Sequence, residues 1–327
     1  MKQFGVNIAS RVLPRLLNTH GKQRLSILIY HRVLPTFDHM RPDEPTIVQF
    51  DWQMRLLQKS FTPLSLLEGV QRMADGTLPE RAVCVTFDDG YADNAQCALP
   101  VLSKYGVPAS VFISTAFING GRMWNDSVRE ALRICAGDTL DLRDLELDVY
   151  PTLSPEDRFN SAEAIIRSIK HRDPELRGRL VEDIEKRVGE LPSDLMLTDT
   201  QLQSLASAGV TIGAHTVNHP ILASVSDHIA ESEIAKSKEQ LESLLQKDVE
   251  VFAYPNGTPG TDYRVEHRDM VERLGFKAAV STHWGVSTAL SDRYQLPRFT
   301  PWDREELKFT LRLLASYRRI DPLLTAG

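Results

Sequence analysis

Several features are scarce or missing in this 327-residue sequence. It holds three cysteines, Cys84, Cys97 and Cys135, with no CxxC pair and no spacing typical of a disulfide framework, which favours a reducing compartment. No segment reaches the ~18 apolar residues of a membrane-spanning helix. Basic residues number 38 against 44 acidic ones, a net charge of −6, so no basic field points to nucleic acid.

The composition that remains is that of an ordinary globular protein. Apolar residues make up 42% of the chain and charged residues 25%. The first 24 residues are basic and lack the continuous apolar core of a signal peptide. Two readings of this segment stay open: a lead-in helix that packs on the domain, or an amphipathic helix on a membrane surface. Without an export signal, the sequence favours a cytoplasmic or membrane-peripheral protein.

Apolar runs and amphipathic stretches alternate along most of the chain, which is typical of parallel strands covered by helices. The expected strands are 24–33, 81–90, 108–115, 210–215, 249–257, 276–282 and a short terminal one over 294–302. The expected helices are 48–61, 65–76, 93–106, 198–209 with Thr198 as N-cap, 226–246, 263–275 and 303–319. Seven or eight such units predict a closed or nearly closed α/β barrel.

One region departs from this alternation of strands and helices. From about 123 to 200 the chain reads as charged helices with no strong strand between them, which predicts a helical insertion in the barrel. We therefore expect a lead-in helix over 1–24, a barrel over 25–302 interrupted by this insertion, and a C-terminal helix over 303–327 that packs on the barrel.

Polar residues that can carry chemistry follow the expected strands where they end. His31 ends the first strand, Asp88 and Asp89 end the second, and His215 and His219 follow the strand at 210–215. In parallel α/β barrels the site lies at this edge of the sheet. Two imidazoles and one carboxylate form a set that leaves open positions on a divalent metal. One aspartate can bind the metal while the other stays free as a base, and the metal charge offsets their repulsion.

These residues carry a family resemblance. "TFDDG" at 86–90, followed far downstream by "HTVNH" at 215–219, resembles the first two motifs of the polysaccharide deacetylases, the NodB homology domain of carbohydrate esterase family four. The resemblance spans about Leu25 to Trp302. It implies a deformed (β/α)7-8 barrel of the polysaccharide deacetylase type, a divalent metal, and hydrolysis of N-acetyl groups on the amino sugars of a glycan.

The resemblance also implies roles for individual residues. Asp88 corresponds to the general base, and Asp89, His215 and His219 correspond to the metal ligands. Zinc is the default ion for such a ligand set, and cobalt, nickel and iron fit in a similar way. An N-acetylated glycan is the implied partner, within exopolysaccharide synthesis; the oligomeric state is left open.

The third motif departs from the family pattern. The family usually reads Arg-x-Pro-Tyr, whereas this chain has "AYPNG", with Ala253 in place of arginine and Asn256 in place of tyrosine. That arginine normally orients the base aspartate. Arg298 in "LPRFTPW" is a candidate to replace it, and a surface ion pair is the equal alternative.

The family's general acid, a histidine in a Leu-x-His motif, has no counterpart near the C-terminus. "LIYHRV" resembles the start of a subgroup that includes the exopolysaccharide poly-N-acetylglucosamine deacetylases, in which a histidine on the first strand takes this role. We therefore expect His31 to protonate the leaving amine, with His283 in "STHWG" as the runner-up. A backbone N–H near Tyr91 is expected to bind the oxyanion, and Trp124 either stacks on a sugar ring or packs within the insertion.

Two rival functions remain at this point. The same barrel and site suit an amidase or imidase that cleaves another C–N bond. A glycan-binding protein without activity belongs to a different class, and only the missing arginine of the third motif favours it.

Overall fold

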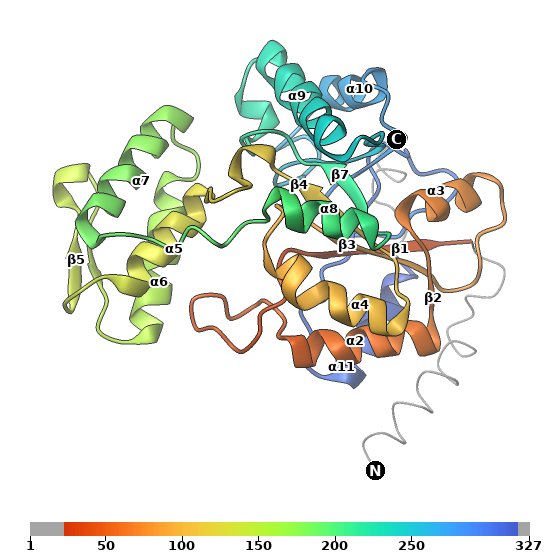
Figure 1. Cartoon of the computed structure of the whole chain (residues 1–327), viewed down its shortest axis with the longest axis horizontal. Helices are drawn as coiled ribbons and strands as arrows, with labels where there is room; N and C mark the ends of the chain where they lie inside the picture. Colours follow the sequence, from red (N-terminus) through yellow and green to blue (C-terminus); the bar gives the residue numbers. More distant parts are fainter. Residues whose placement is uncertain (1–22, 320–327) are drawn as a thin grey trace. The chain divides into compact units, whose positions relative to one another are not determined.

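The computed structural model describes residues 23–319, and its central element is a parallel sheet of seven strands in the order β1-β3-β4-β7-β8-β9, with β2 paired to β3 (Figure 1). The strands are β1 (Leu25–Tyr30), β2 (Thr62–Pro63), β3 (Ala82–Phe87), β4 (Ala109–Ile113), β7 (Thr211–Ala214), β8 (Val251–Ala253) and β9 (Ala278–Val280). β1 and β3 pair over their full length, from Leu25–Ala82 to Tyr30–Phe87. Their carboxyl ends therefore lie side by side.

The segment that follows β9 joins the two ends of this curled sheet. Leu296 forms a parallel bridge to Val280 of β9, and Phe299 forms one to Leu28 of β1. The terminal strand expected over 294–302 is thus reduced to isolated bridges. Pro297 explains this, because proline has no N–H to donate to a ladder.

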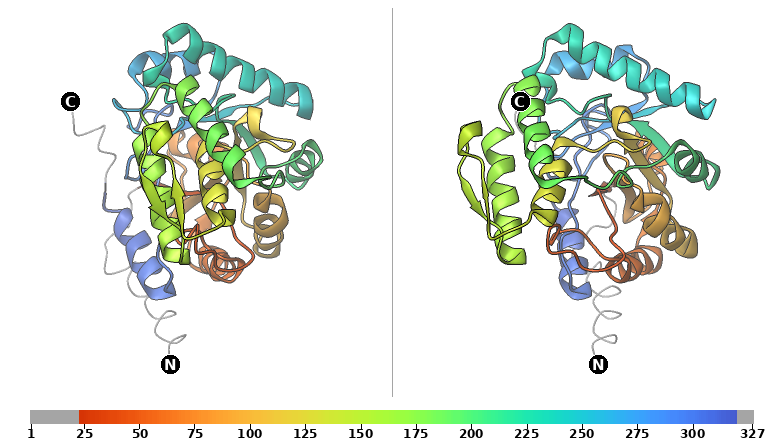
Figure 2. Two further views of the ribbon diagram at one scale, coloured as in Figure 1. Left: turned by 90° about the vertical axis from the view of Figure 1, so that its left-hand side faces the viewer. Right: turned by 60° about the vertical axis from the view of Figure 1, so that its left-hand side comes forward.

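Helices surround the sheet in the larger of two compact units, which comprises the described parts of 1–35, 44–116 and 197–327 (Figure 2). These helices are α2 (Ile47–Ser60), α3 (Leu66–Ala74), the π-helical turn η1 (Asn94–Ala98), α4 (Leu99–Tyr105), α8 (Asp199–Ser207), the 3-10 turn η4 (Leu222–Ser224), α9 (Asp227–Leu245), α10 (Val265–Arg273) and α11 (Glu306–Ser316). Thr198 caps α8, as expected, by accepting from the Gln201 amide. This parallel sheet with its surrounding helices confirms the α/β barrel-like architecture predicted from the sequence.

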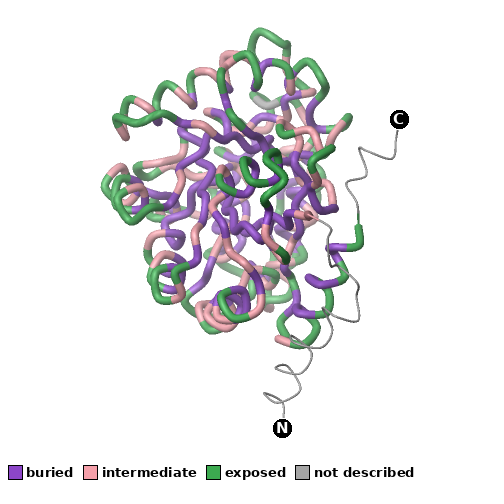
Figure 3. The backbone as a smooth tube through the Cα atoms, turned by 90° about the vertical axis from the view of Figure 1, so that its right-hand side faces the viewer, coloured by how far each residue is buried: buried purple, intermediate pink, exposed green. Residues whose placement is uncertain are grey.

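The interior of this unit is apolar at one end of the strands and polar at the other. Every residue of β1 and β3 is buried. Figure 3 shows that buried segments gather in the interior and exposed ones at the periphery. Cys84, Val280 and Leu296 belong to one buried apolar cluster with residues of α3. Because side chains alternate along a strand, Thr86 and Asp88 continue the face of Cys84, and Arg298 continues that of Leu296. The strand pattern therefore leads from an apolar core to a polar site.

The second unit consists of Thr36–Asp43 and Phe117–Met196. Its elements are α5 (Trp124–Ile134), β5 (Thr139–Asp141), the 3-10 turn η3 (Arg143–Leu145), β6 (Val149–Pro151), α6 (Pro155–Ile169) and α7 (Pro174–Val188); another 3-10 turn, η2 (Thr115–Phe117), leads into it. The antiparallel pair β5–β6 was not foreseen, because strands of three residues leave little periodic signal. Met40 is buried in the apolar cluster of these helices.

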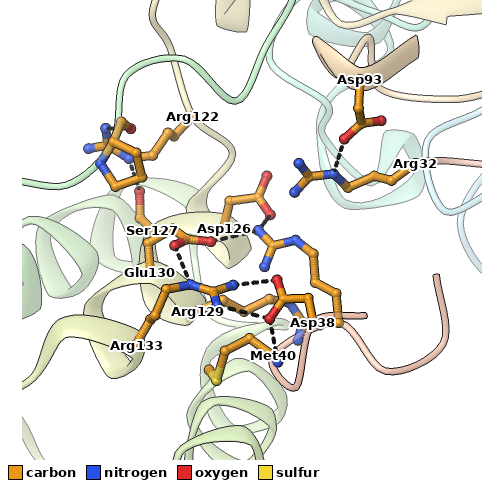
Figure 4. A network of polar contacts seen from close by, with 12 residues as sticks. Arg32, Asp38, Met40, Asp93, Arg122, Asp126, Ser127, Arg129, Glu130 and Arg133 are labelled. Atoms are coloured by element: carbon orange, nitrogen blue, oxygen red, sulfur yellow. Dashed lines mark hydrogen bonds and ion pairs between the residues drawn. The ribbon is translucent and has the colours of Figure 1, made fainter. Parts of the chain in front are cut away.

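A polar network holds the 36–43 segment within this second unit (Figure 4). Arg133 donates to both carboxylate oxygens of Asp38, at 2.9 and 2.6 Å. Arg41 is buried and pairs with Asp126 at 2.7 Å and with Glu130 at 3.1 Å. These pairs fix the long loop after β1 to the helical unit.

The lead-in helix expected over 1–24 lies, apart from its last two residues, outside the described residues. Within 23–319, every helix is too short or too polar to cross a membrane.

Candidate active site

The two neighbouring aspartates sit on a sharp turn at the end of β3. The Asp88 amide donates to the Tyr30 carbonyl at 3.0 Å, and the Asp89 carbonyl accepts from Ser114 at 3.3 Å. Asp89 has φ 77° and Gly90 has φ 88°, both in the left-handed region. Such backbone is uncommon for residues other than glycine, although aspartate adopts it more readily than most, and strained backbone clusters at functional sites. The turn directs the two carboxylates to different partners.

The two histidines are brought together by the loop after β7. Thr216 and His219 have φ 64° and 52°, and the Thr216 hydroxyl accepts from the His219 amide at 3.1 Å. Glu233 of α9 accepts from the amides of Val217 and Asn218, at 2.9 and 2.8 Å. This tight loop leaves the rings of His215 and His219 with centroids 4.8 Å apart.

Asp89, His215 and His219 have the geometry of a metal site. One ligand atom from each lies within 4.8 Å of the others, and both Nε2 atoms are 3.5 Å from Asp89 Oδ1. Ligands bound to one tetrahedral zinc at about 2.0–2.1 Å would be roughly 3.3–3.4 Å apart. His215 Nδ1 lies 2.7 Å from the Ala253 carbonyl, which leaves Nε2 free for a metal. The residues present therefore fit a divalent ion.

The electrostatics of these three residues suit the same purpose. Burial raises the pKa of Asp89, but the neighbouring imidazoles of His215 and His219 outweigh it, and the pKa falls below its usual value. Burial lowers the pKa of His219 to about 4. At neutral pH the site therefore presents an ionised carboxylate and an uncharged imidazole, which are the forms that bind metals.

Asp88 pairs with Arg298, the arginine whose role the sequence left undecided. Both Nη atoms of Arg298 donate to its two oxygens at 2.7 Å, and the arginine is fully buried. Arg298 also donates to the Ser281 carbonyl at 2.7 Å and to the Thr86 hydroxyl at 3.2 Å. Burial raises the pKa of Asp88, but the charge of Arg298 outweighs it and the net shift is downward. Arg298 is thus an internal ion-pair partner and not a surface one.

His31 lies within the electrostatic range of both aspartates. Burial lowers its pKa, but the charges of Asp89, Asp88 and Glu44 outweigh burial, and the net shift is upward. Glu44 accepts from the amide of Arg32 at 3.3 Å. His31, directly after β1, therefore has an imidazole whose protonated form is favoured.

The remaining candidate residues have other contacts. His283 Nδ1 lies 2.5 Å from the Ser281 hydroxyl, and its backbone carbonyl accepts from Arg298. Tyr91 is buried, with the Arg32 guanidinium 4.6 Å above its ring. Trp124 belongs to the second unit, where it packs against the helical core with Arg177 4.7 Å above its ring. Catalytic or sugar-binding roles for these residues stay predictions.

Sequence reasoning missed several residues around the site. Ala253 takes part through its backbone carbonyl, which no side-chain pattern reveals. Ser281 and Glu44 belong to no sequence motif that would have drawn attention to them. Asp93 and Asn94, in contrast, stand in the same "DDGYADN" run as the two aspartates, so their position was a usable signal.

The comparison with protein families decides the assignment. A family model described as polysaccharide deacetylase matches residues 75–279, more than half of the chain. The chain belongs to the polysaccharide deacetylase family. As a polysaccharide deacetylase it is a hydrolase that acts on N-acetyl amide bonds of polysaccharides.

One curated relative resembles the sequence, and two solved structures resemble the fold. The deacetylase is 23% identical over 283 residues to the "Putative polysaccharide deacetylase YxkH" of Bacillus subtilis (strain 168), covering 86% of this chain and 73% of that protein. It resembles the fold of the Streptococcus pyogenes deacetylase PplD in complex with acetate, with a TM-score of 0.58, 20% identity, and coverage of 88% and 97%. IcaB from Ammonifex degensii gives a TM-score of 0.57, 18% identity, and coverage of 88% and 97%.

Proposed function

We propose that this polysaccharide deacetylase removes N-acetyl groups from amino sugars with a divalent metal ion, most simply zinc, held by Asp89, His215 and His219. Asp88 is the general base and His31 the general acid. The observation that carries the proposal is the pairing of a metal-binding triad with a second carboxylate, Asp88, that is held apart from it by Arg298.

The ion, when bound, supplies an acidified water and polarises the acetyl carbonyl. Asp88 would accept a proton from the water whose oxygen adds to the acetyl carbon. Its ion pair keeps it ionised, and a carboxylate has about four lone-pair sites, of which Arg298 takes two. The remaining sites can accept from water, so that the same contact orients the base and leaves it able to act.

His31 supplies the second proton. The C–N bond of an amide breaks poorly unless the nitrogen is protonated, so the leaving amine takes a proton from the imidazolium. The charges of Asp88, Asp89 and Glu44 favour that protonated form. The products are acetate and the free amino sugar, and proton transfer from Asp88 back to His31, directly or through water, restores the site.

The test is acetate release from N-acetylglucosamine oligomers, before and after treatment with a chelator and after zinc is added back. We expect release that the chelator abolishes and zinc restores. His219→Gln should lose both bound metal and activity. His267→Gln is the matched control, because His267 is also a buried imidazole near a carboxylate, 3.7 Å from Asp227 on α9. Chelator-resistant acetate release, or hydrolysis only of non-sugar amides, would contradict the proposal.

A further inference from the structure

The residues that follow β1 are tied to one pair of side chains. The Asn94 amide group donates to the His31 carbonyl at 2.9 Å. Asp93 accepts from the Arg32 guanidinium at 2.7 Å, as Figure 4 shows, and from the Val33 amide at 3.1 Å. Three consecutive residues, His31 to Val33, are therefore held by two neighbouring residues of another loop.

That loop is the one that carries the aspartates. Asp88 and Asn94 lie only six positions apart, and Asn94 begins the π-helical turn η1. π-helical turns are rare and are frequently found at functional sites. Here the turn brings Asn94, which is almost fully buried, within hydrogen-bond distance of the carbonyl of His31, the first residue after β1. One short segment thus contains the base, one metal ligand and the support of the histidine.

This arrangement has an energetic cost. Asn94 Oδ1 is buried with no hydrogen-bond partner among residues 23–319, and an unpaired buried acceptor costs free energy. A side chain of similar size without polar atoms would avoid that cost. The bond from Nδ2 to the His31 carbonyl is the contact that such a side chain would lose.

We propose that Asn94 and Asp93 are positioning residues that set the place of the His31 imidazole relative to Asp88. The inference rests on the proposed function, since it assumes that His31 is the acid. The acid follows β1 and the base follows the neighbouring strand β3. The hydrogen bonds of Asp93 and Asn94 connect the loops that come after these two strands. A small displacement of a catalytic group weakens catalysis strongly.

Leaving-group chemistry separates this role from a structural one. An acetyl amide needs the acid, because its amine leaves protonated. An aryl acetate such as 4-nitrophenyl acetate releases a phenolate that leaves without a proton. Loss of the acid's position should therefore slow the amide and spare the ester, whereas a damaged metal site or fold should slow both.

The variant Asn94→Leu keeps the volume and removes the hydrogen bond. We expect kcat for N-acetylglucosamine oligomers to fall at least 10-fold, within the range of acid catalysis, with KM, zinc content and kcat for 4-nitrophenyl acetate changed less than 2-fold. Gln203→Leu is the matched control, since the Gln203 amide group also donates to a backbone carbonyl, that of Leu244, and should leave both rates unchanged. Combining Asn94→Leu with His31→Ala should add no further loss to that of His31→Ala.

Two results would overturn the inference: an equal fall of amide and ester rates, or unchanged amide turnover in a folded Asn94→Leu protein. Asp93→Asn gives a second reading if Asn94→Leu does not fold, because it keeps shape and loses the charge that pairs with Arg32. It should show the same selective loss on the amide. Failure of the proposed function is distinct, since the unmodified enzyme would then release no acetate from the oligomers.

Discussion

Arg298 and Asp88 form a two-pronged ion pair across 210 residues of sequence, with both N–O distances at 2.7 Å. Neither side chain is more than 4% exposed. Breaking a buried pair leaves one charge without compensation, at a cost of about 3–5 kcal/mol. The pair therefore serves both stability and the protonation state of the base.

Arg298→Gln tests both effects. We expect the free energy of unfolding in urea to fall by about 3–5 kcal/mol. The pKa of Asp88 should rise, because burial is no longer offset, so the acid limb of the pH–activity profile moves to higher pH. Arg55→Gln, which breaks the partly exposed pair with Glu306, should cost less than about 1 kcal/mol. Equal losses in the two variants would contradict the assignment of Arg298 as the partner of the base.

Asp88→Asn separates catalysis from metal binding. Asparagine keeps the shape and can keep one of the two hydrogen bonds from Arg298, but it cannot take a proton, so we expect kcat to fall by about 10²–10⁴-fold. Bound zinc, measured by elemental analysis, should stay the same, because Asp89 and the two histidines are unchanged. Asp303→Asn is the control, since Asp303 is another buried aspartate paired with an arginine, Arg312. Loss of zinc from Asp88→Asn would show that Asp88 is itself a ligand.

Metal binding should stabilise the folded chain. Zinc at 100 times its dissociation constant adds about 2.7 kcal/mol to the free energy of unfolding. The melting temperature should rise with zinc in the unmodified protein and stay constant in Asp89→Ala. A rise of the same size in both proteins would place the stabilising ion elsewhere.

The metal-free protein should lose stability on mild acidification. The pKa of His219 is about 4 in the folded state, against roughly 6.5 in an unfolded chain. Between these values the unfolded state binds more protons, so stability falls as the pH drops from about 6.5 to about 4, by up to about 3 kcal/mol. Urea unfolding across this range measures the slope. His219→Gln should show a shallower one, and an identical slope would exclude His219 as its source.

Gly213 in β7 leaves no room for a larger residue. A Cβ atom there would lie 2.4 Å from the Phe112 ring and 2.8 Å from Val251. Gly213→Ala should cost about 1–3 kcal/mol by overpacking, and it should lower zinc affinity because His215 lies two residues on. Gly178→Ala in α7, where a Cβ would meet nothing within 4 Å, should stabilise by about 0.5–1 kcal/mol. A melting scan and a zinc titration of both variants check this contrast, and equal stability would contradict the packing.

The strands and the meeting of Asp89, His215 and His219 at one place could be predicted from the sequence because both signals are local. Apolar runs mark β1, β3 and β7, and polar residues at their ends must meet at one edge of a parallel sheet. The partner of Asp88 could not be decided in this way. Arg298 lies next to Pro297 in a segment without a regular strand pattern, and its burial depends on the whole sheet closing around it.

The second unit was harder to delimit for a similar reason. Its helices carry a clear periodic pattern, but the 36–43 segment reads only as a polar loop. Asp38 and Met40 join that unit through contacts with residues about 90 positions away or more, which local patterns do not encode.

The burial of Met40 among α5, α6 and α7 has a practical consequence for protein engineering. Deleting 117–196 alone would remove the residues that surround Met40 and Arg41. An exposed apolar side chain and an unpaired charged one would then remain a few positions after His31. A minimal barrel therefore requires two excisions, with a short polar linker in place of 36–43 as well.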